Sequence, residues 1–337
     1  MFILCIKFIL SAAIVVFAGY KICIYADKIA QIVKIGRTFI GLMLLAVVTS
    51  LPEMAVTISA VKIQALDLGL GDLFGSNLFN LTIVGIIFLA FIKKPKMVSF
   101  EPIHFISLSI SAILITLASM GIVFYNFINP HVGYSKFLLD LWTVLILVIY
   151  LFGAYLIFRS EKSKTGALPE KDFSKSKGIA QTWLKFLAFS ALLVGFAIYL
   201  ARLGDIIAQI PVAGVALGGT FVGSLLIAIT TSLPETAVAI SAIRLGFLDM
   251  ALGNIFGSNM FNMLIIPIMD LALGRKVILS CVSSVHLFTA LFVLISTALV
   301  SVGLIYRSRR KIPGLAWDSF AILFVYFAAN VVNFYLR

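Results

Sequence analysis

Long hydrophobic runs follow one another along almost the whole chain, and polar residues are concentrated in the segments between them. The runs lack the period-two alternation of membrane β-strands, whereas a helix of roughly 20 apolar residues crosses about 30 Å of hydrocarbon. The pattern therefore predicts an all-α polytopic membrane protein with ten transmembrane helices. The predicted spans are Phe2–Ile24, Ile35–Val61, Leu68–Ile92, Ile103–Phe124, Phe137–Ile157, Trp183–Leu200, Val212–Ile243, Met250–Leu273, Val277–Ile305 and Ala316–Tyr335.

The composition supports this fold class and excludes several others. Of 337 residues, 62% are hydrophobic and 12% are charged, whereas soluble proteins are about 25% charged. A cytosolic enzyme, a disordered protein and a nucleic-acid-binding protein are therefore not expected. The three cysteines stand singly in apolar stretches and form neither a disulfide framework nor a metal motif.

The basic residues predict the orientation in the membrane. One long polar segment, 159–181, lies between the fifth and sixth spans and is rich in lysine. Because Lys and Arg favour the cytoplasmic side, this linker is expected inside and both termini outside. That orientation places 19 of the 26 Lys and Arg residues inside. The net charge of +12 thus records topology. A multi-pass protein of the cell (inner) membrane is expected, with the lipid bilayer as its surroundings.

A strong internal repeat divides the chain. Segments 49–84 and 231–266 align without a gap at an offset of 182, with 21 identities in 36 positions. The similarity continues upstream, where the first span matches the sixth. Two five-helix repeats, 1–158 and 182–337, are therefore expected on either side of the 159–181 linker. An odd number of spans inverts the second copy, as in many secondary transporters.

Two glutamates at matched positions carry the candidate chemistry. Glu53 and Glu235 each lie within an otherwise apolar span. A carboxylate at that depth needs a partner, a cation or a water-filled cavity. A structural carboxylate would explain one such residue. For two symmetric ones, with no basic residue in the middle of any span, a bound cation is the better interpretation.

Oxygen-bearing neighbours fit a cation. A proline precedes each glutamate and can free main-chain carbonyls in the preceding turn. Hydroxyl residues lie three and four positions before each glutamate on the same helix face, although some can bond to their own helix. These residues are Thr49, Ser50, Thr231 and Ser232.

The following span of each repeat adds hydroxyls and amides in the motif GSNxFN. Ser76 and Asn80 share one helix face, as do Ser258 and Asn262. Close helix packing explains the glycines of this motif but not its asparagines. Amide oxygens explain them if some complete an all-oxygen cage. Such a cage selects Ca²⁺ or Na⁺, and two carboxylates balance one Ca²⁺ or two Na⁺.

At these residues the chain resembles the cation/calcium exchanger superfamily, most closely its prokaryotic sodium/calcium exchangers. The resemblance implies Na⁺-driven Ca²⁺ exchange by alternating access, with the first and sixth helices as gates. It implies that Glu53 and Glu235 are the principal Ca²⁺ ligands, joined by the carbonyls of Thr49 and Thr231. It further implies flanking Na⁺ sites at Ser50, Ser76, Ser232 and Ser258, and a central position for Asn80 and Asn262.

Two departures from the family pattern bear on the ions. Family members often carry Asp in one repeat where this chain has Asn80 and Asn262, which leaves the stoichiometry and the coupling ion open. Asp72 stands where the other repeat has Asn254. It is either a cation funnel near the outer mouth or a solvated helix start. Asp27 and Asp205 match between repeats near span ends and are expected to cap or to pair.

Three functional alternatives stay open. The first is Na⁺/Ca²⁺ antiport, and the second is exchange of Ca²⁺ or another cation for H⁺, with the glutamates as proton carriers. The third is a cation sensor or passive channel without coupled transport. No hydrolase or redox constellation and no P-loop is present, so neither an enzyme, nor ATP use, nor a cofactor is expected.

Overall fold

The computed structural model describes residues 2–90, 100–128, 139–162, 176–209, 211–212, 215–216, 230–274, 276–309 and 317–336. Within these ranges, nine helical segments are long and apolar enough to cross a membrane. They correspond to nine of the ten predicted spans, and the all-α membrane fold is confirmed. The seventh predicted span, Val212–Ile243, includes residues 217–229, which lie outside the described residues.

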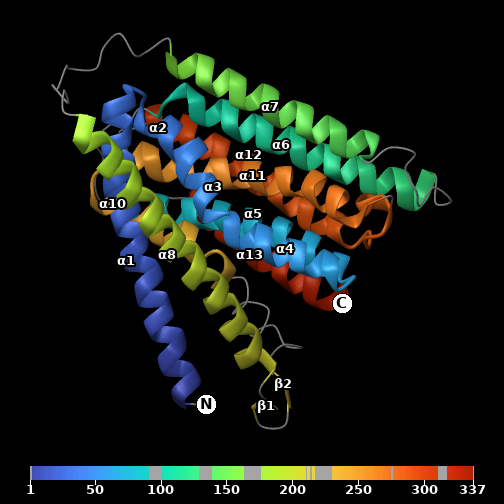
Figure 1. Cartoon of the computed structure of the whole chain (residues 1–337). Helices are drawn as coiled ribbons and strands as arrows, with labels where there is room; N and C mark the ends of the chain where they lie inside the picture. The colour runs from blue at the N-terminus through green and yellow to red at the C-terminus, as the bar shows by residue number, and fades with distance from the viewer. Residues whose placement is uncertain are drawn as a thin grey trace. The chain divides into compact units, whose positions relative to one another are not determined.

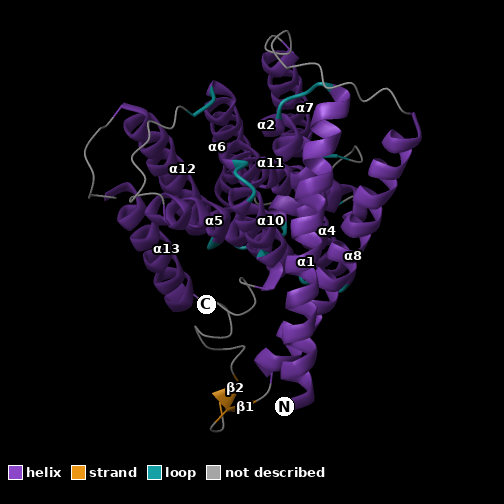
Figure 2. Cartoon of the chain, turned by 90° about the vertical axis from the view of Figure 1, so that its left-hand side faces the viewer, coloured by secondary structure: helices purple, strands orange, loops and turns teal. Residues whose placement is uncertain are grey.

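The seventh span does not begin where the sequence predicts it. Strands β1 (Pro211–Val212) and β2 (Val215–Ala216) pair antiparallel as a short hairpin, drawn in orange in Figure 2. Pro211 cannot donate a backbone hydrogen bond to a helix, and valine favours extended backbone. Helix α10 (Leu233–Arg244) forms the end of this span.

The chain divides into two compact units, and each unit takes segments from both sequence repeats. Unit 1 comprises Met1–Pro52 and Ala154–Ser258, and unit 2 comprises Glu53–Gly153 and Asn259–Arg337. The repeats themselves, and the linker between them, stay a prediction. The ends of that linker are helical, because α7 (Leu141–Lys162) runs to Lys162 and α8 (Ser176–Gln209) begins at Ser176.

In unit 1, the long helices α1 (Phe2–Val33) and α8 lie side by side (Figure 1). Both helices extend beyond the predicted spans. Helix α10 also packs on α1, where the Cys23 thiol donates to the Val238 carbonyl over 3.4 Å.

The second predicted span is helical but interrupted. It consists of α2 (Arg37–Phe39), the π-helix η1 (Ile40–Leu45), α3 (Ala46–Thr49) and α4 (Leu51–Lys62). The break falls at Ser50, whose ψ of 3° leaves the helical range. Ser232, its repeat counterpart, breaks the chain before α10 with a ψ of 12°. The proline that follows each serine by two positions fits the first turn of the next helix, where no N–H bond is needed.

The beginning of α11 (Leu248–Leu273) packs directly on the backbone of α2 and of the π-helix. A Cβ atom at Gly257 would lie 2.2 Å from the Leu42 carbonyl oxygen, and one at Gly253 would lie 2.6 Å from that of Thr38. Small residues allow membrane helices this close approach. These two glycines therefore have a packing role in unit 1.

Unit 2 is built around α5 (Leu66–Ala90), which packs against α12 (His286–Arg309) and α13 (Trp317–Leu336) (Figure 2). Helix α6 (Pro102–Val123), continued by the π-helix η2 (Phe124–Ile128), also packs on α12. The short 3₁₀ helix η5 (Ile278–Ser280) contacts both α6 and η2.

A buried carboxylate, Asp270, joins several of these elements. One oxygen accepts hydrogen bonds from the backbone N–H of Asp140 at 3.1 Å and the Thr143 hydroxyl at 2.8 Å. The other accepts from the backbone N–H of Ile278 at 2.8 Å. Asp140 in turn accepts from the Tyr125 hydroxyl and from the backbone N–H at the start of α7. Asp270 therefore fastens the end of α11 to α7 and η5.

We expect Asp270→Asn to destabilise the protein by about 2–4 kcal/mol, because one amide oxygen replaces two acceptors and its NH₂ faces buried donors. Thermal unfolding of the purified protein in detergent measures the change. Thr143→Val removes one of the three bonds and should cost about 1 kcal/mol. Equal stability of Asp270→Asn and the wild type would contradict this role.

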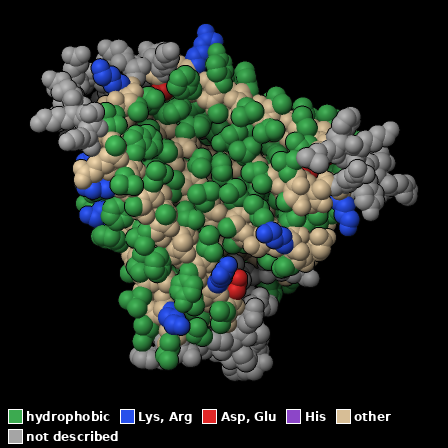
Figure 3. All heavy atoms as spheres, viewed as in Figure 1, with side chains coloured by type: hydrophobic (Ala, Val, Ile, Leu, Met, Phe, Trp, Pro, Cys, Tyr) green, Lys and Arg blue, Asp and Glu red, His purple; other side chains and the backbone are tan. Residues whose placement is uncertain are grey.

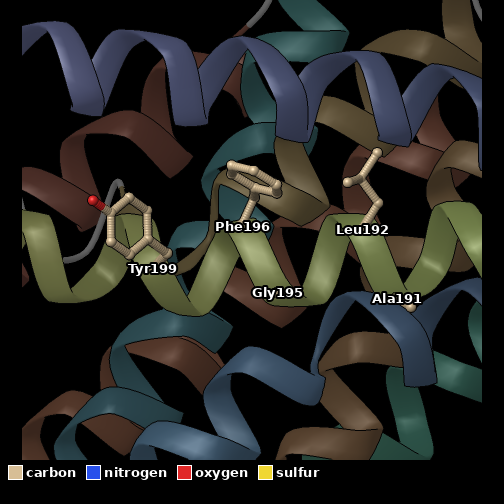
Figure 4. A pocket seen from close by; sticks show the side chains of 5 residues that line it. All are labelled: Ala191, Leu192, Gly195, Phe196 and Tyr199. Atoms are coloured by element: carbon tan, nitrogen blue, oxygen red, sulfur yellow. The ribbon is translucent and has the colours of Figure 1, made fainter.

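Apolar side chains cover most of the face in Figure 3, where Lys and Arg side chains are scattered. One apolar hollow of about 370 Å³ lies on α8, lined by Ala191, Leu192, Gly195, Phe196 and Tyr199. The side chains of Leu192 and Phe196 point toward α1 (Figure 4). This hollow contains none of the predicted cation ligands.

Candidate cation site

All ten candidate ligands are buried, with at most 3% of each residue exposed. Unit 1 holds Thr49, Ser50, Thr231, Ser232, Glu235 and Ser258, and unit 2 holds Glu53, Ser76, Asn80 and Asn262. Polar side chains are rarely buried this completely unless they are bonded to a partner or bind a ligand.

In unit 1, Glu235 lies in the first turn of α10, directly after the break at Ser232. Its Oε1 accepts a hydrogen bond from the Ser50 hydroxyl over 3.4 Å. Ser50 is itself the residue at which the equivalent helix of the other repeat is broken. The structure thus brings two of the predicted ligands into contact, the carboxylate of Glu235 and the hydroxyl of Ser50, and each lies at a helix interruption.

A second group in unit 1 forms around Thr49. Its hydroxyl lies 3.1 Å from that of Ser258 and donates to Oδ1 of Asn254 over 3.2 Å. Thr49 also bonds back to the Ala46 carbonyl at 3.3 Å, the self-bonding that the sequence left open for hydroxyls of this kind. Asn254 was not among the predicted ligands, although it is fully buried. The sequence feature that could have identified Asn254 is its alignment with Asp72, a polar residue at the matching position of the other repeat.

In unit 2, Glu53 lies in the first turn of α4, as Glu235 does in α10. Ser76 is buried in α5. Asp72, six residues into the same helix, is partly buried, and its role as a funnel or a helix start stays a prediction.

Four asparagines of unit 2 form a reciprocal network between α5 and α11. The Asn77 amide donates to the Asn259 carbonyl at 3.3 Å, and the Asn259 amide donates to the Asn77 carbonyl at 3.2 Å. The Asn80 amide donates to Oδ1 of Asn259 at 3.0 Å, and the Asn262 amide donates to Oδ1 of Asn77 at 2.9 Å. The GSNxFN motif therefore supplies two different kinds of asparagine.

The Oδ1 atoms of Asn80 and Asn262 are buried, and no donor of the described residues lies within hydrogen-bond distance of either. A buried carbonyl oxygen of this kind is costly unless it has another ligand. Asn77 and Asn259, by contrast, use both amide atoms within the network. The sequence singled out Asn80 and Asn262 as candidate ligands but assigned no role to Asn77 and Asn259.

Several other acidic residues lie outside the candidate ligands. Asp27 bonds to Arg37 at 2.5 Å and to Gln31 at 2.8 Å, which confirms the pairing expected for it. Asp205, its repeat counterpart, is exposed on α8. Asp67 bonds to His286 at 3.0 Å.

The described residues contain no group of three or more His, Cys, Asp or Glu side chains that could hold a metal. The candidate donors in each unit are instead one carboxylate with neutral oxygens. Such donors suit hard, weakly held cations better than tightly bound transition metals. A multi-span fold with buried oxygen ligands at interrupted helices is the architecture of a secondary cation transporter.

The family model for the sodium/calcium exchanger protein matches residues 3–160 and again residues 182–335. The chain therefore belongs to the sodium/calcium exchanger family and is a membrane antiporter of cations, not an enzyme.

Relatives and solved structures agree with this assignment. The chain is 27% identical to the inner membrane protein YrbG of Escherichia coli, across 77% of this chain and 76% of that protein. It is 26% identical to the sodium/calcium exchanger MaX1 of Methanosarcina acetivorans, across 92% and 93%. A structure of the sodium-calcium exchanger NCX_Mj has the same fold, with a TM-score of 0.71, 19% identity and 98% of both chains covered.

Proposed function

We propose that this protein exchanges Na⁺ for Ca²⁺ by alternating access, and that Glu53 and Glu235 bind the ions. One observation carries the proposal. Each repeat has a glutamate at the same position, in the first turn of a helix, and neither glutamate has any exposed surface. The bond from Ser50 to Glu235 supports a shared role for these residues. The names of MaX1 and NCX_Mj support Na⁺ and Ca²⁺ as the ions.

The remaining ligands are proposed from the donors described in each unit. Thr49, Ser50, Thr231, Ser232 and Ser258 of unit 1, and Ser76, Asn80 and Asn262 of unit 2, would contribute the remaining oxygens. The carbonyls of Thr49 and Thr231 would join them, because each ends a helical segment. Ca²⁺ and Na⁺ would then compete for the same negative charge, which is a physical basis for exchange rather than uniport.

The proposed location is the cell (inner) membrane, with both termini outside and the 159–181 linker in the cytoplasm. The distribution of Lys and Arg supports this orientation, and the E. coli relative is named as an inner membrane protein.

Transport by the purified protein in liposomes tests the proposal. Vesicles loaded with Na⁺, with K⁺ or with a proton gradient are diluted into ⁴⁵Ca²⁺, and uptake is measured. We expect uptake only from Na⁺-loaded vesicles. Uptake driven by the pH gradient alone would replace Na⁺ by H⁺ as the coupling ion, and uptake without any counter-ion would identify a channel and overturn antiport.

We further expect exchange to be electroneutral, because two carboxylates balance either one Ca²⁺ or two Na⁺. The membrane potential can be clamped at positive or negative values with valinomycin and K⁺, and the initial uptake rate should then change less than about twofold. Exchange that moved a net charge would respond more strongly, because each charge carried across 100 mV is worth about 2.3 kcal/mol. A strong dependence on the potential would show that a third charge moves in each cycle.

A further inference from the structure

The two asparagines of each GSNxFN motif have different roles in the hydrogen-bond network between α5 and α11. Each asparagine side chain has one donor end and one acceptor end, and which end faces a given direction depends on its bonds. Asn77 and Asn259 have both ends occupied, since each donates to the other's backbone carbonyl and accepts from Asn262 or Asn80. Their orientation therefore fixes that of Asn80 and Asn262.

Flipping any one of these amide groups, so that its oxygen and NH₂ exchange places, would bring two acceptors or two donors face to face. If the Asn77 amide turned, its oxygen would face the Asn259 carbonyl and its NH₂ would face the Asn262 NH₂. If the Asn259 amide flipped, its oxygen would face the Asn77 carbonyl and its NH₂ would face the Asn80 NH₂. Because all four residues are buried, with at most 1% exposed, water cannot relieve such pairs, and each would leave buried polar atoms unpaired.

We propose that Asn77 and Asn259 are positioning residues that direct the carbonyl oxygens of Asn80 and Asn262 toward the transported ion. The inference rests on the proposed function, which makes Asn80 and Asn262 ligands. It adds that positions 80 and 262 accept only a neutral side chain that donates a hydrogen bond to Asn259 or Asn77. The carbonyl oxygens of Asn80 and Asn262, which no described donor satisfies, are the atoms that are directed in this way.

The network also restricts the charge of the site. A carboxylate at position 262 would place an acceptor oxygen against Oδ1 of Asn77, about where the Asn262 amide now donates at 2.9 Å. Position 80 has the same relation to Asn259 at 3.0 Å. At either position a carboxylate would therefore leave the asparagine oxygen facing a second acceptor.

Removal of the positioning residues gives the first test. In Asn77→Ala and Asn259→Ala, the amides of Asn262 and Asn80 lose their acceptors, and we expect the KM for Ca²⁺ to rise about tenfold while the maximal rate changes less than threefold. Asn126→Ala is the matched control, because the Asn126 amide also donates to a backbone carbonyl, that of Val282 at 3.2 Å, but takes no part in the asparagine network. An unchanged KM in both network variants, with folded protein, would overturn the proposal.

Cation binding measured without transport separates this inference from the proposed function. The rise in Tm on addition of Ca²⁺ or Na⁺ to the protein in detergent should be smaller in Asn259→Ala than in Asn126→Ala. If the wild type is stabilised by a cation but carries no coupled flux, the proposed function fails while the network can still be judged. A cation-induced rise in Tm that is the same in both variants would overturn the positioning role.

Aspartate substitutions give the second test. In Asn80→Asp and Asn262→Asp a carboxylate oxygen would face the acceptor Oδ1 of Asn259 or Asn77, about where an amide now donates at 3.0 or 2.9 Å. We expect the KM for Ca²⁺ to rise about tenfold in each variant at constant pH, as in the alanine variants. A wild-type KM in both aspartate variants would show that the network accepts a carboxylate, and would overturn the restriction on charge.

Discussion

Replacement of either buried glutamate by glutamine is expected to reduce Na⁺-driven Ca²⁺ uptake at least a hundredfold, while the protein still folds. Glutamine keeps the shape of Glu53 or Glu235 but removes the charge that balances the cation, so loss of a close charge pair in a buried site costs several kcal/mol of binding. Initial ⁴⁵Ca²⁺ uptake into proteoliposomes measures the effect.

Glu101→Gln is the matched control for this pair. It makes the same chemical change at the residue that precedes α6, outside the candidate ligands, and uptake should stay within about twofold of the wild type. Size-exclusion profiles in detergent report folding. Full activity of Glu53→Gln or Glu235→Gln would show that the proposed cage needs only one carboxylate or none.

A second large effect is expected from a single methyl group at Gly257. In Gly257→Ala the added Cβ would lie 2.2 Å from the Leu42 carbonyl oxygen and 2.7 Å from the Ala46 Cβ. Because a backbone atom cannot move aside as a flexible side chain can, α11 and the π-helix must separate. We expect a loss of about 3 kcal/mol or more of stability, seen as a fall in Tm of several degrees.

Gly195→Ala on α8 is the control, because no atom of the described residues lies within 4 Å of a Cβ built there. Alanine is the better helix former, so this variant should be as stable as the wild type or slightly more stable. Gly253→Ala, with its nearest contact at 2.6 Å, should fall between the two. A Gly257→Ala protein with wild-type Tm would mean that the close contact with the π-helix is not needed for stability.

The sequence predicted the helices of this fold well because a membrane span is a long-range average over some 20 residues, insensitive to local detail. It also predicted a helix disturbance near the glutamates, since proline removes a donor at a known position. The π-helical turn at Ile40–Leu45 was not predicted, because Ile, Gly, Leu and Met are compatible with an ordinary α-helix. It packs against α11 where Leu42 lies close to Gly257, a long-range contact that no local pattern encodes.

The candidate site was predicted as a set of residue types rather than as a set of bonds. The repeat identified the buried glutamates and marked the four asparagines, because chemistry at matched positions stands out against an apolar background. It singled out Asn80 and Asn262 as ligands but could not find the hydrogen bonds of Asn77 and Asn259, because those bonds depend on the pairing of α5 with α11. Asp140 and Asp270 were missed for a similar reason: their only signal was a carboxylate inside a predicted span.

The location of each glutamate in the first turn of a short helix has a consequence for the unloaded carrier. The N-terminal turn presents unsatisfied N–H groups that act as a partial positive charge and stabilise a nearby carboxylate by about 0.3–2 kcal/mol. If Glu53 and Glu235 bind the ions as proposed, they would thereby keep part of their electrostatic compensation in the unloaded protein. The same field would oppose an incoming cation by a similar amount, which would weaken affinity and speed release. A transporter gains from that balance, since an ion held too tightly on one side of the membrane is never delivered to the other.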